Sequence, residues 1–359
     1  MINRCFAAAG LFGALCTSVH AQYLMIPDSA ADRIMLFSAA DGSPVNLDFI
    51  IDAGGTPFDF TTPKDVQQVG NEIWVTDQVS DIVVRFTASL TPQHIATITG
   101  NMNNIRGMGQ LGNTVYVSNS DAGAGPGDAV VMYSTDGTHL GFFAAPDPFD
   151  CTEFNGQLLV ADIAGDDISI YDPLGNFVSV FHASDGASGI DFPEQLIVLN
   201  TGPAGAQEVW ATGFTAPAGI YRYDAAGVQV AYYPVSTGPR GIAPLGNGAM
   251  MYTEGTAVMS FVPGSTDGPI VILSGGITPQ FIGALTLTPG PTCDSIDFNN
   301  DGLFPDTLDI DDFLSVFSGG VCTNSPHCGD IDFNNDGLFP DTLDIDALLS
   351  VFSGGNCIG

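Results

Sequence analysis

The chain has 359 residues, with 7 Lys and Arg against 40 Asp and Glu, which gives a formal net charge of −33 at pH 7. So acidic a surface repels nucleic acid and anionic membranes, because those contacts need Lys and Arg to neutralise phosphates, and it attracts divalent cations instead. We therefore expect no nucleic-acid partner, and the length leaves room for one or two domains.

The first 21 residues have the pattern of an export signal. Arg4 supplies positive charge, residues 5–16 are rich in Ala, Leu and Phe, and residues 19–21 offer a cleavage site ahead of Gln22. This apolar run is too short to span a bilayer, and no later run reaches about 18 apolar residues. We predict a signal peptide over residues 1–21, no transmembrane segment, and a secreted or cell-surface protein.

Six short β-type segments recur at intervals of about 40 to 50 residues, which is the spacing of propeller blades. They cover residues 23–28, 72–77, 114–119, 157–162, 208–213 and 249–254. Most are followed by a second alternating strand that ends in an aromatic residue, and then by a turn with Gly or Asn.

A further strand, introduced by a short signature, precedes five of these segments. The signatures lie at residues 63–66, 105–108, 148–151, 188–190 and 239–242. A sixth, at residues 281–284, has no segment after it, whereas the first segment has no signature before it. We predict that a strand near residues 281–288 completes the blade begun at residue 23, giving an all-β, six-bladed β-propeller over residues 22–288.

These repeats resemble NHL-repeat propellers, whose pattern is matched best by residues 73–77 and 31–34. The resemblance covers roughly residues 22–289 and implies a fold, since one fold hosts many activities. Six-bladed relatives include lactonases and lyases that hold a metal with Glu, Asn and Asp, but their local signatures are not visible in this sequence.

Aligning the signatures predicts a set of side chains at one position near the central channel: Lys64, Arg106, Phe149, Ser188, Arg240 and Ile282. A second set falls at the ends of the following strands: Asp28, Asp77, Asn119, Asp162 and Glu254. One interpretation is a pocket at the channel mouth that binds an unknown anionic ligand, or a metal held by the acids. The other is that the acids cap turns and pair with nearby cations. No nucleophile–base pattern stands out, so no catalytic residue is predicted.

Residues 289–292 form a predicted linker, after which a 14-residue segment at 297–310 reappears almost unchanged at 332–345. Each copy opens Asp-x-Asn-x-Asp-Gly, the start of a calcium loop, where alternate side chains converge on a hard cation and Gly allows the turn. The predicted ligands are Asp297, Asn299, Asp301, the Leu303 carbonyl and Asp309, then Asp332, Asn334, Asp336, the Leu338 carbonyl and Asp344. Asp309 and Asp344 also fall where a helix N-cap is favoured.

An amphipathic helix is expected after each loop. Ile310, Phe313, Leu314 and Phe317 have helical spacing, as do residues 345, 348, 349 and 352. Two helices this short cannot form a core alone, so we predict a small module over residues 293–359 of two paired calcium loop–helix repeats, stabilised by two metals and two disulfides.

The four cysteines of this region, Cys293, Cys322, Cys328 and Cys357, predict two disulfides in an exported protein. Each copy is bracketed by Cys at the same separation, which suits Cys293–Cys322 with Cys328–Cys357. Cys151, in an apolar strand, is predicted to be a buried structural thiol.

Residues 293–359 resemble a type I dockerin, and more closely the bacterial dockerin-like C-terminal anchors that end near Gly-Cys. The resemblance implies calcium as cofactor and a cohesin-like or surface scaffold protein as partner. It also implies pseudo-twofold packing, which favours Cys293–Cys357 with Cys322–Cys328. One extra residue precedes the closing carboxylate, so Asp306 and Asp341 are alternative final ligands.

We therefore expect a secreted, non-enzymatic recognition propeller that is anchored or docked through its calcium-binding tail. The alternative is a secreted lyase, lactonase or polysaccharide-active hydrolase with its site at the channel mouth. A third interpretation treats the tail as a sorting signal only.

Overall fold

A computed structural model describes residues 21–52, 54, 56–184, 187–287, 293–303, 306–325, 328–329, 331–334, 342–353 and 357. The chain divides into two compact units, residues 1–286 and 287–359, and each is considered by itself. The predicted signal peptide up to residue 20 and the predicted linker lie outside the described residues.

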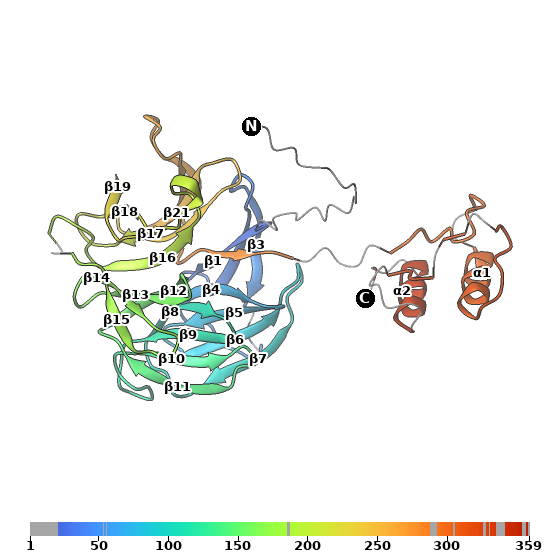
Figure 1. Ribbon diagram of the computed structural model, residues 1–359, viewed down its shortest axis with the longest axis horizontal. Coiled ribbons are helices and arrows are strands. Elements are labelled where there is room, and N and C mark those ends of the chain that lie inside the picture. The colour runs from blue at the N-terminus through green and yellow to red at the C-terminus, as the bar shows by residue number, and fades with distance from the viewer. Residues whose placement is uncertain are drawn as a thin grey trace, which may run out of the picture. The chain divides into compact units, whose positions relative to one another are not determined.

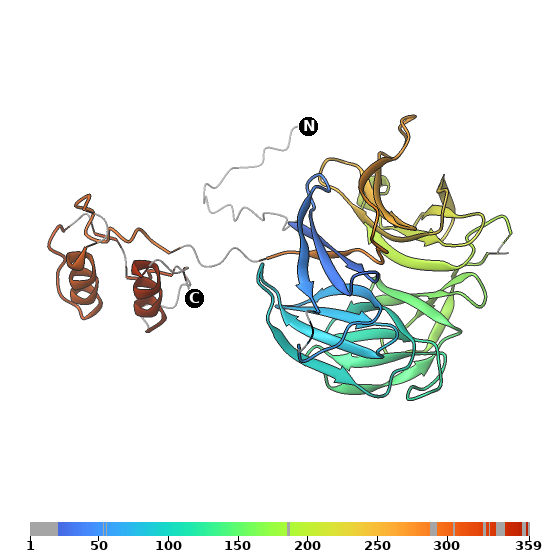
Figure 2. The ribbon, with the colours of Figure 1, turned by 180° about the vertical axis from the view of Figure 1, so that it is seen from behind.

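The first unit is a six-bladed β-propeller in which every blade is a four-stranded antiparallel sheet. Blade one contains β24 (Gly283–Leu285), β1 (Tyr23–Asp28), β2 (Arg33–Ser38) and β3 (Pro44–Ile51). Blade two contains β4 (Pro63–Val69), β5 (Glu72–Asp77), β6 (Ile82–Thr87) and β7 (His94–Thr99). Blade three contains β8 (Ile105–Leu111), β9 (Thr114–Asn119), β10 (Ala129–Ser134) and β11 (His139–Ala144). The blades follow one another in chain order round the ring (Figures 1 and 2).

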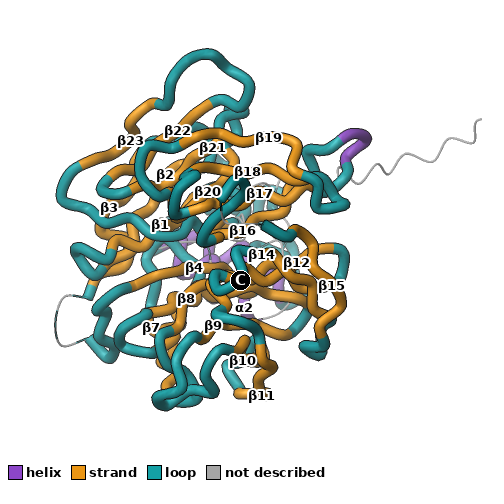
Figure 3. The backbone as a smooth tube through the Cα atoms, turned by 90° about the vertical axis from the view of Figure 1, so that its left-hand side faces the viewer, coloured by secondary structure: helices purple, strands orange, loops and turns teal. Residues whose placement is uncertain are grey.

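Blades four to six repeat the pattern. Blade four contains β12 (Pro148–Phe154), β13 (Gln157–Asp162), β14 (Asp167–Tyr171) and β15 (Phe177–His182). Blade five contains β16 (Pro193–Leu199), β17 (Glu208–Gly213), β18 (Gly219–Tyr223) and β19 (Gln229–Pro234). Blade six contains β20 (Pro239–Pro244), β21 (Met250–Glu254), β22 (Ala257–Phe261) and β23 (Ile270–Ser274). A short 3-10 turn, η1 (Pro203–Gly205), lies between β16 and β17. In Figure 3 the first strands of the blades lie near the centre and the last strands at the rim.

The predicted ring closure is confirmed. β24 pairs with β1 through Tyr23 opposite Leu285, so the last strand of the unit completes the first blade. The six predicted segments are also confirmed as β1, β5, β9, β13, β17 and β21. The two ends of the propeller segment are thereby joined within one sheet.

The core of the propeller lies between the faces of neighbouring blades, because both faces of the inner strands carry apolar side chains. Between blades two and three, for example, Trp74 and Val83 pack in one cluster with Val117 and Val131. Equivalent clusters join blades four to five and six to one. The inner strands, such as β5 and β9, are accordingly almost completely buried, whereas the rim strands, such as β7 and β15, are exposed or half-buried over most of their length.

The second unit contains two helices, α1 (Thr307–Phe317) and α2 (Thr342–Phe352), which Figure 1 draws in orange and red. Asp306 is the N-cap of α1, since its side chain accepts the Leu308 N–H at 2.8 Å. Asp309 lies at the third helical position and completes a capping box. The predicted N-cap role therefore belongs to Asp306 and not to Asp309.

The two copies pack around a common core with matching members 35 residues apart: Ile296 and Ile331, Phe298 and Phe333, and Phe313 and Leu348. The buried helix face includes Phe313 and Leu348 as predicted, with Phe317 and Phe352 packed against the core, but it differs from the predicted face at one position in each helix. Leu314 and Leu349 are exposed, whereas Asp309 and Asp344 are buried. Apolar spacing alone does not distinguish these faces, because each helix carries apolar residues on more than one side.

The structure pairs Cys293 with Cys357 and Cys322 with Cys328, with Cα atoms 5.5 and 6.4 Å apart. Of the two pairings described above, this is the one that the dockerin resemblance implies. Cys151 is buried as a free thiol. Among the described residues, no helix is long and apolar enough to cross a membrane.

Candidate functional site

The structure corrects the fifth-blade member of the aligned channel position. β16 begins at Pro193, which pairs with the last residue of β17, Gly213. Pro63 holds the same place in blade two, opposite the end of β5. Glu194 therefore stands where Ser188 was predicted, because the residues around Ser188 belong to the loop ahead of the strand.

The first-blade member is corrected in the same way. Pro279 forms an isolated antiparallel bridge with Asp28, the last residue of β1. Gln280, and not Ile282, is therefore the equivalent residue. A signature of three or four residues does not determine where a strand begins after a long loop, whereas the backbone pairing does.

Six side chains thus share one position at the N-terminal ends of the innermost strands, and we call them the mouth ring: Lys64, Arg106, Phe149, Glu194, Arg240 and Gln280.

The mouth ring is held together by ion pairs and hydrogen bonds among its own members. Lys64 Nζ lies 3.3 Å from Glu194 Oε2 and 3.0 Å from Gln280 Oε1, and Arg240 Nη1 lies 2.6 Å from Glu194 Oε1. The Lys64 ammonium also sits 4.7 Å from the Phe149 ring centroid. Burial lowers the pKa of Lys64 to about 8, although the Glu194 charge raises it.

The cations are therefore neutralised within the protein. Arg106, the third of the ring, pairs with Asp147 at 2.8 Å. All six Lys and Arg side chains of the described residues, Arg33, Lys64, Arg85, Arg106, Arg222 and Arg240, form ion pairs with Asp or Glu. An anionic ligand at this end would have to compete with these pairs.

The second predicted set consists of turn-capping groups: Asp28, Asp77, Asn119, Asp162 and Glu254. Asp77 accepts four backbone N–H groups, from Thr61, Thr62, Val79 and Ser80. Asp28, Asn119 and Asp162 accept turn N–H groups in the same manner, and Glu254 accepts the Thr237 hydroxyl. These contacts agree with the interpretation that the acids cap turns.

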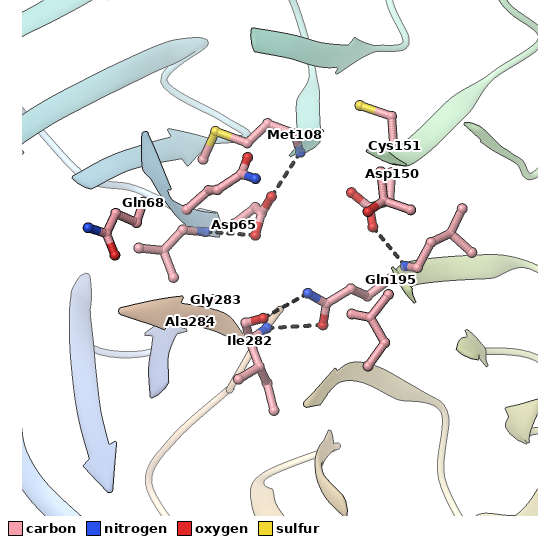
Figure 4. A pocket seen from close by; sticks show the side chains of 14 residues that line it. Asp65, Gln68, Met108, Asp150, Cys151, Gln195, Ile282, Gly283 and Ala284 are labelled. Atoms are coloured by element: carbon pink, nitrogen blue, oxygen red, sulfur yellow. Dashed lines mark hydrogen bonds between the residues drawn. The ribbon is translucent and has the colours of Figure 1, made fainter. Parts of the chain in front are cut away.

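A cavity of about 250 Å³ lies farther along the channel from the mouth ring. Asp65, Asp150 and Gln195 line it from three different blades, one residue after their mouth-ring neighbours (Figure 4). Asp65 Oδ2 accepts the Met108 N–H at 2.8 Å, and Asp150 Oδ2 accepts the Leu196 N–H at 2.7 Å. Each carboxylate thus ties its blade to the next one.

Burial dominates the electrostatics of this pair. It raises the pKa of Asp65 to about 6, against the backbone hydrogen bonds that lower it. Burial also raises the pKa of Asp150 well above its usual value, and the charge of Asp65 adds to the shift. The sequence analysis missed both carboxylates. The sequence does contain a signal for them: a polar residue directly follows the mouth-ring position, where blades three and six carry Gly107 and Gly241.

In the C-terminal unit, the first repeated loop brings its side-chain oxygens together. The Asp301 N–H donates to Asp297 Oδ1 at 3.0 Å and to Asn299 Oδ1 at 3.1 Å, so these two oxygens lie close to each other. Gly302, with φ +81°, takes the left-handed conformation that the turn needs. The buried Asp309 carboxylate faces the loop, since its Oδ1 lies 3.4 Å from the Asn299 nitrogen.

The second loop repeats part of this arrangement. The buried Asp344 carboxylate lies 3.4 Å from the Asn334 nitrogen, and Asp332 is also described. Asp336, Leu338 and Asp341 lie outside the described residues. Within the described part of the chain, no three Asp, Glu, His or Cys side chains gather closely enough to hold a metal on their own.

No family model matches the sequence, and no curated protein matches it. Solved structures do. The chain is similar to one in the crystal structure of a nidogen/laminin complex, at 12% identity and a TM-score of 0.54, over 73% of this chain and 98% of that one. The structure of a putative gluconolactonase is similar at 12% sequence identity and a TM-score of 0.52, over 72% of this chain and 87% of that chain. The structure of a streptogramin B lyase is similar at 15% sequence identity and a TM-score of 0.50, over 74% of this chain and 88% of that chain. Such likeness shows the propeller fold alone.

Proposed function

We propose that the protein is a secreted, non-enzymatic recognition protein, in which the propeller binds a ligand and the C-terminal unit, once loaded with calcium, attaches the chain to a surface scaffold. The single observation that carries the proposal is that the first loop brings the side-chain oxygens of Asp297 and Asn299 close together and faces the buried Asp309 carboxylate, in a segment whose sequence contains no Lys or Arg. Carboxylates that lie close together repel one another, and a bound divalent cation offsets that repulsion.

The residues present fit such an ion. Asp297, Asn299 and Asp301 would supply side-chain oxygens, Leu303 its carbonyl and Asp309 a carboxylate, which is the oxygen-rich donor set that calcium prefers. In the second copy Asp332, Asn334 and Asp344 would act alike, with Asp336 and Leu338. Bound calcium would supply positive charge and join each loop to the start of its helix. The final ligand of the first loop stays open between Asp309 and Asp306.

Calorimetry on the chelator-treated full chain tests the calcium step. We expect about two ions per chain. Asp309→Asn combined with Asp344→Asn should weaken calcium binding at least tenfold, because each change removes a charged ligand. Asp311→Asn with Asp346→Asn is the matched control, since these exposed carboxylates also lie 35 residues apart. A wild-type chain that takes up no calcium, and whose helix amides exchange equally fast with and without chelator, would make the proposal wrong.

Exposed apolar side chains support the attachment step. Leu308 and Leu343, and likewise Leu314 and Leu349, are exposed at matching positions of the two helices. Exposed apolar side chains of this kind would be available for a partner protein to cover. A cohesin-like or surface scaffold domain should bind the full chain only with calcium present. Leu314→Ser with Leu349→Ser should weaken that binding while calcium uptake stays normal.

An enzyme is the second candidate, a lyase, lactonase or polysaccharide-active hydrolase. Two of the similar structures are those of a putative gluconolactonase and a streptogramin B lyase. Turnover of a lactone or a polysaccharide by the full chain, abolished by Asp77→Asn, would favour it. The turn hydrogen bonds of Asp28, Asp77 and Asp162 are instead those of structural groups.

A further inference from the structure

The charged side chains that line the channel cavity are all acidic. Its lining includes two carboxyl side chains, Asp65 and Asp150, and no Lys or Arg. The nearest cation along β4, Lys64, belongs to the mouth ring, where Glu194 and Gln280 hold its ammonium. A volume of about 250 Å³ would accommodate roughly eight water molecules, so a small organic group can enter it.

The cavity wall presents acceptor oxygens that a ligand could use. Gln67 Oε1 is buried there and has no hydrogen-bond partner among the described residues. The amide nitrogen of Gln195 already donates to the Ile282 carbonyl at 2.9 Å. Asp65 and Asp150 point into the same space from blades two and four (Figure 4). The lining contains no positively charged donor, and a ligand that supplies one would gain the most.

One end of the cavity is closed and the other is open. Lys64 and Glu194 of the mouth ring are buried at the closed end. Toward the C-terminal ends of the inner strands exposure increases, from half-buried Gln68 and Thr152 to exposed Ala284. A ligand would therefore enter past Ala284, opposite to the end that the sequence analysis favoured.

Polar surface predominates between these points, but the wall also includes apolar residues, with Val66, Met108, Leu196 and Ile197 among them. An alkyl stem can lie along such a surface while its charged end reaches the carboxylates. A calcium ion fits less well. It takes six to eight oxygens, whereas only two carboxylates are present and each already accepts a backbone N–H.

We infer that the channel cavity binds a primary alkylammonium group, which enters past Ala284 and donates to Asp65, Asp150 and Gln67. Ion pairing would offset the burial of the two carboxylates, which otherwise favours their protonated forms. This inference names the ligand class of the proposed recognition propeller and so rests on that role. Calcium binding by the tail does not enter it.

Calorimetry on the full chain at pH 8 tests the inference with two probes of one shape, n-pentylamine and 1-pentanol. We expect the amine to bind at least tenfold more tightly than the alcohol. Nα-acetyl-lysinamide and 1,5-diaminopentane then distinguish a lysine side chain from a free diamine, and tighter binding of either supports the inference. Equal binding of amine and alcohol, or no binding of any amine, would overturn it.

Variants localise the effect. Asp150→Asn keeps an acceptor for the Leu196 N–H and should weaken amine binding at least tenfold, without changing alcohol binding. Asp65→Asn provides a second test at the other carboxylate, should the first variant fold poorly. Asp172→Asn, in an exposed turn remote in sequence from the cavity residues, should leave amine affinity unchanged. Full amine affinity in both folded cavity variants would contradict the inference, even if the tail binds calcium as proposed.

Discussion

The Thr212 hydroxyl donates a 2.8 Å hydrogen bond to the carbonyl oxygen of Arg240 and so ties blade five to blade six. It also accepts the Gln195 N–H of its own blade at 2.9 Å. Thr76 and Thr253 occupy the same strand position and make the same pair of bonds to their neighbours. Buried hydroxyls at this one position thus connect the inner strands around part of the ring.

Thr212→Val should destabilise the propeller by about 1–3 kcal/mol, because it leaves the buried Gln195 N–H without its acceptor. Urea unfolding followed by tryptophan fluorescence measures this, since both tryptophans, Trp74 and Trp210, lie in the propeller. Thr91→Val, in an exposed turn, is the control and should change the free energy of unfolding by less than about 0.5 kcal/mol. Equal effects of the two changes would contradict the prediction.

Much of the fold can be predicted from the sequence, because the second strand of each blade is apolar on both faces and recurs at a blade-like spacing. Residues 157–162 and 208–213 show this directly as β13 and β17. Closure follows from the unmatched strand at each end of the propeller. The start of β16 at Pro193 could not be predicted, because a Ser-Gly-Ile sequence in the preceding loop resembles the signature that introduces the inner strand in the other blades.

The site was harder to predict because it depends on contacts between blades. The alignment placed Lys64 and Arg240 at one position, yet nothing in it indicated that Glu194 lies between them. Asp65 and Asp150 likewise acquire their role from backbone N–H groups of the next blade. Such partners become visible only once the ring is assembled.

Gly107 lies against Asp150, and this contact leads to a second prediction. A Cβ at residue 107 would overlap Asp150 Oδ1 and lie 2.9 Å from the Asp150 Cα, so backbone would have to move. Gly107→Ala should therefore destabilise the propeller by about 1–3 kcal/mol in urea unfolding. Gly268→Ala is the control, because a Cβ there meets nothing within 4 Å. An unchanged midpoint for Gly107→Ala would mean that the inner strands are less tightly packed than described.

The raised pKa of Asp65 predicts a pH dependence of stability. Between pH of about 4 and about 6 the folded state holds a proton that the unfolded state has released. This group's contribution to the free energy of unfolding should therefore fall as pH rises through that window, by up to about 1.4 kcal/mol per pH unit. Asp65→Asn removes the dependence.

Urea unfolding of wild type and Asp65→Asn at pH 4.5, 5.5 and 6.5 measures it. The wild type should lose stability relative to the variant as pH rises. The raised pKa of Asp150 extends the same trend to higher pH, and because the charge of Asp65 contributes to that shift, this part of the trend is weaker in the variant. A difference that grows in favour of the wild type with rising pH would contradict the prediction.

The two disulfides should contribute unequally to the C-terminal unit. Cys293 and Cys357 are 64 residues apart, whereas Cys322 and Cys328 are separated by 6. In the chain-entropy description the longer loop stabilises by roughly 4 kcal/mol and the shorter by roughly 2 kcal/mol, since more unfolded conformations are removed. Cys293→Ser with Cys357→Ser should therefore accelerate amide exchange in α1 and α2 more than Cys322→Ser with Cys328→Ser. Calcium concentration must be equal in both measurements, because a bound ion stabilises the folded unit by mass action. Faster exchange in the second variant would show that the short link, and not the joining of the unit's ends, holds the helices together.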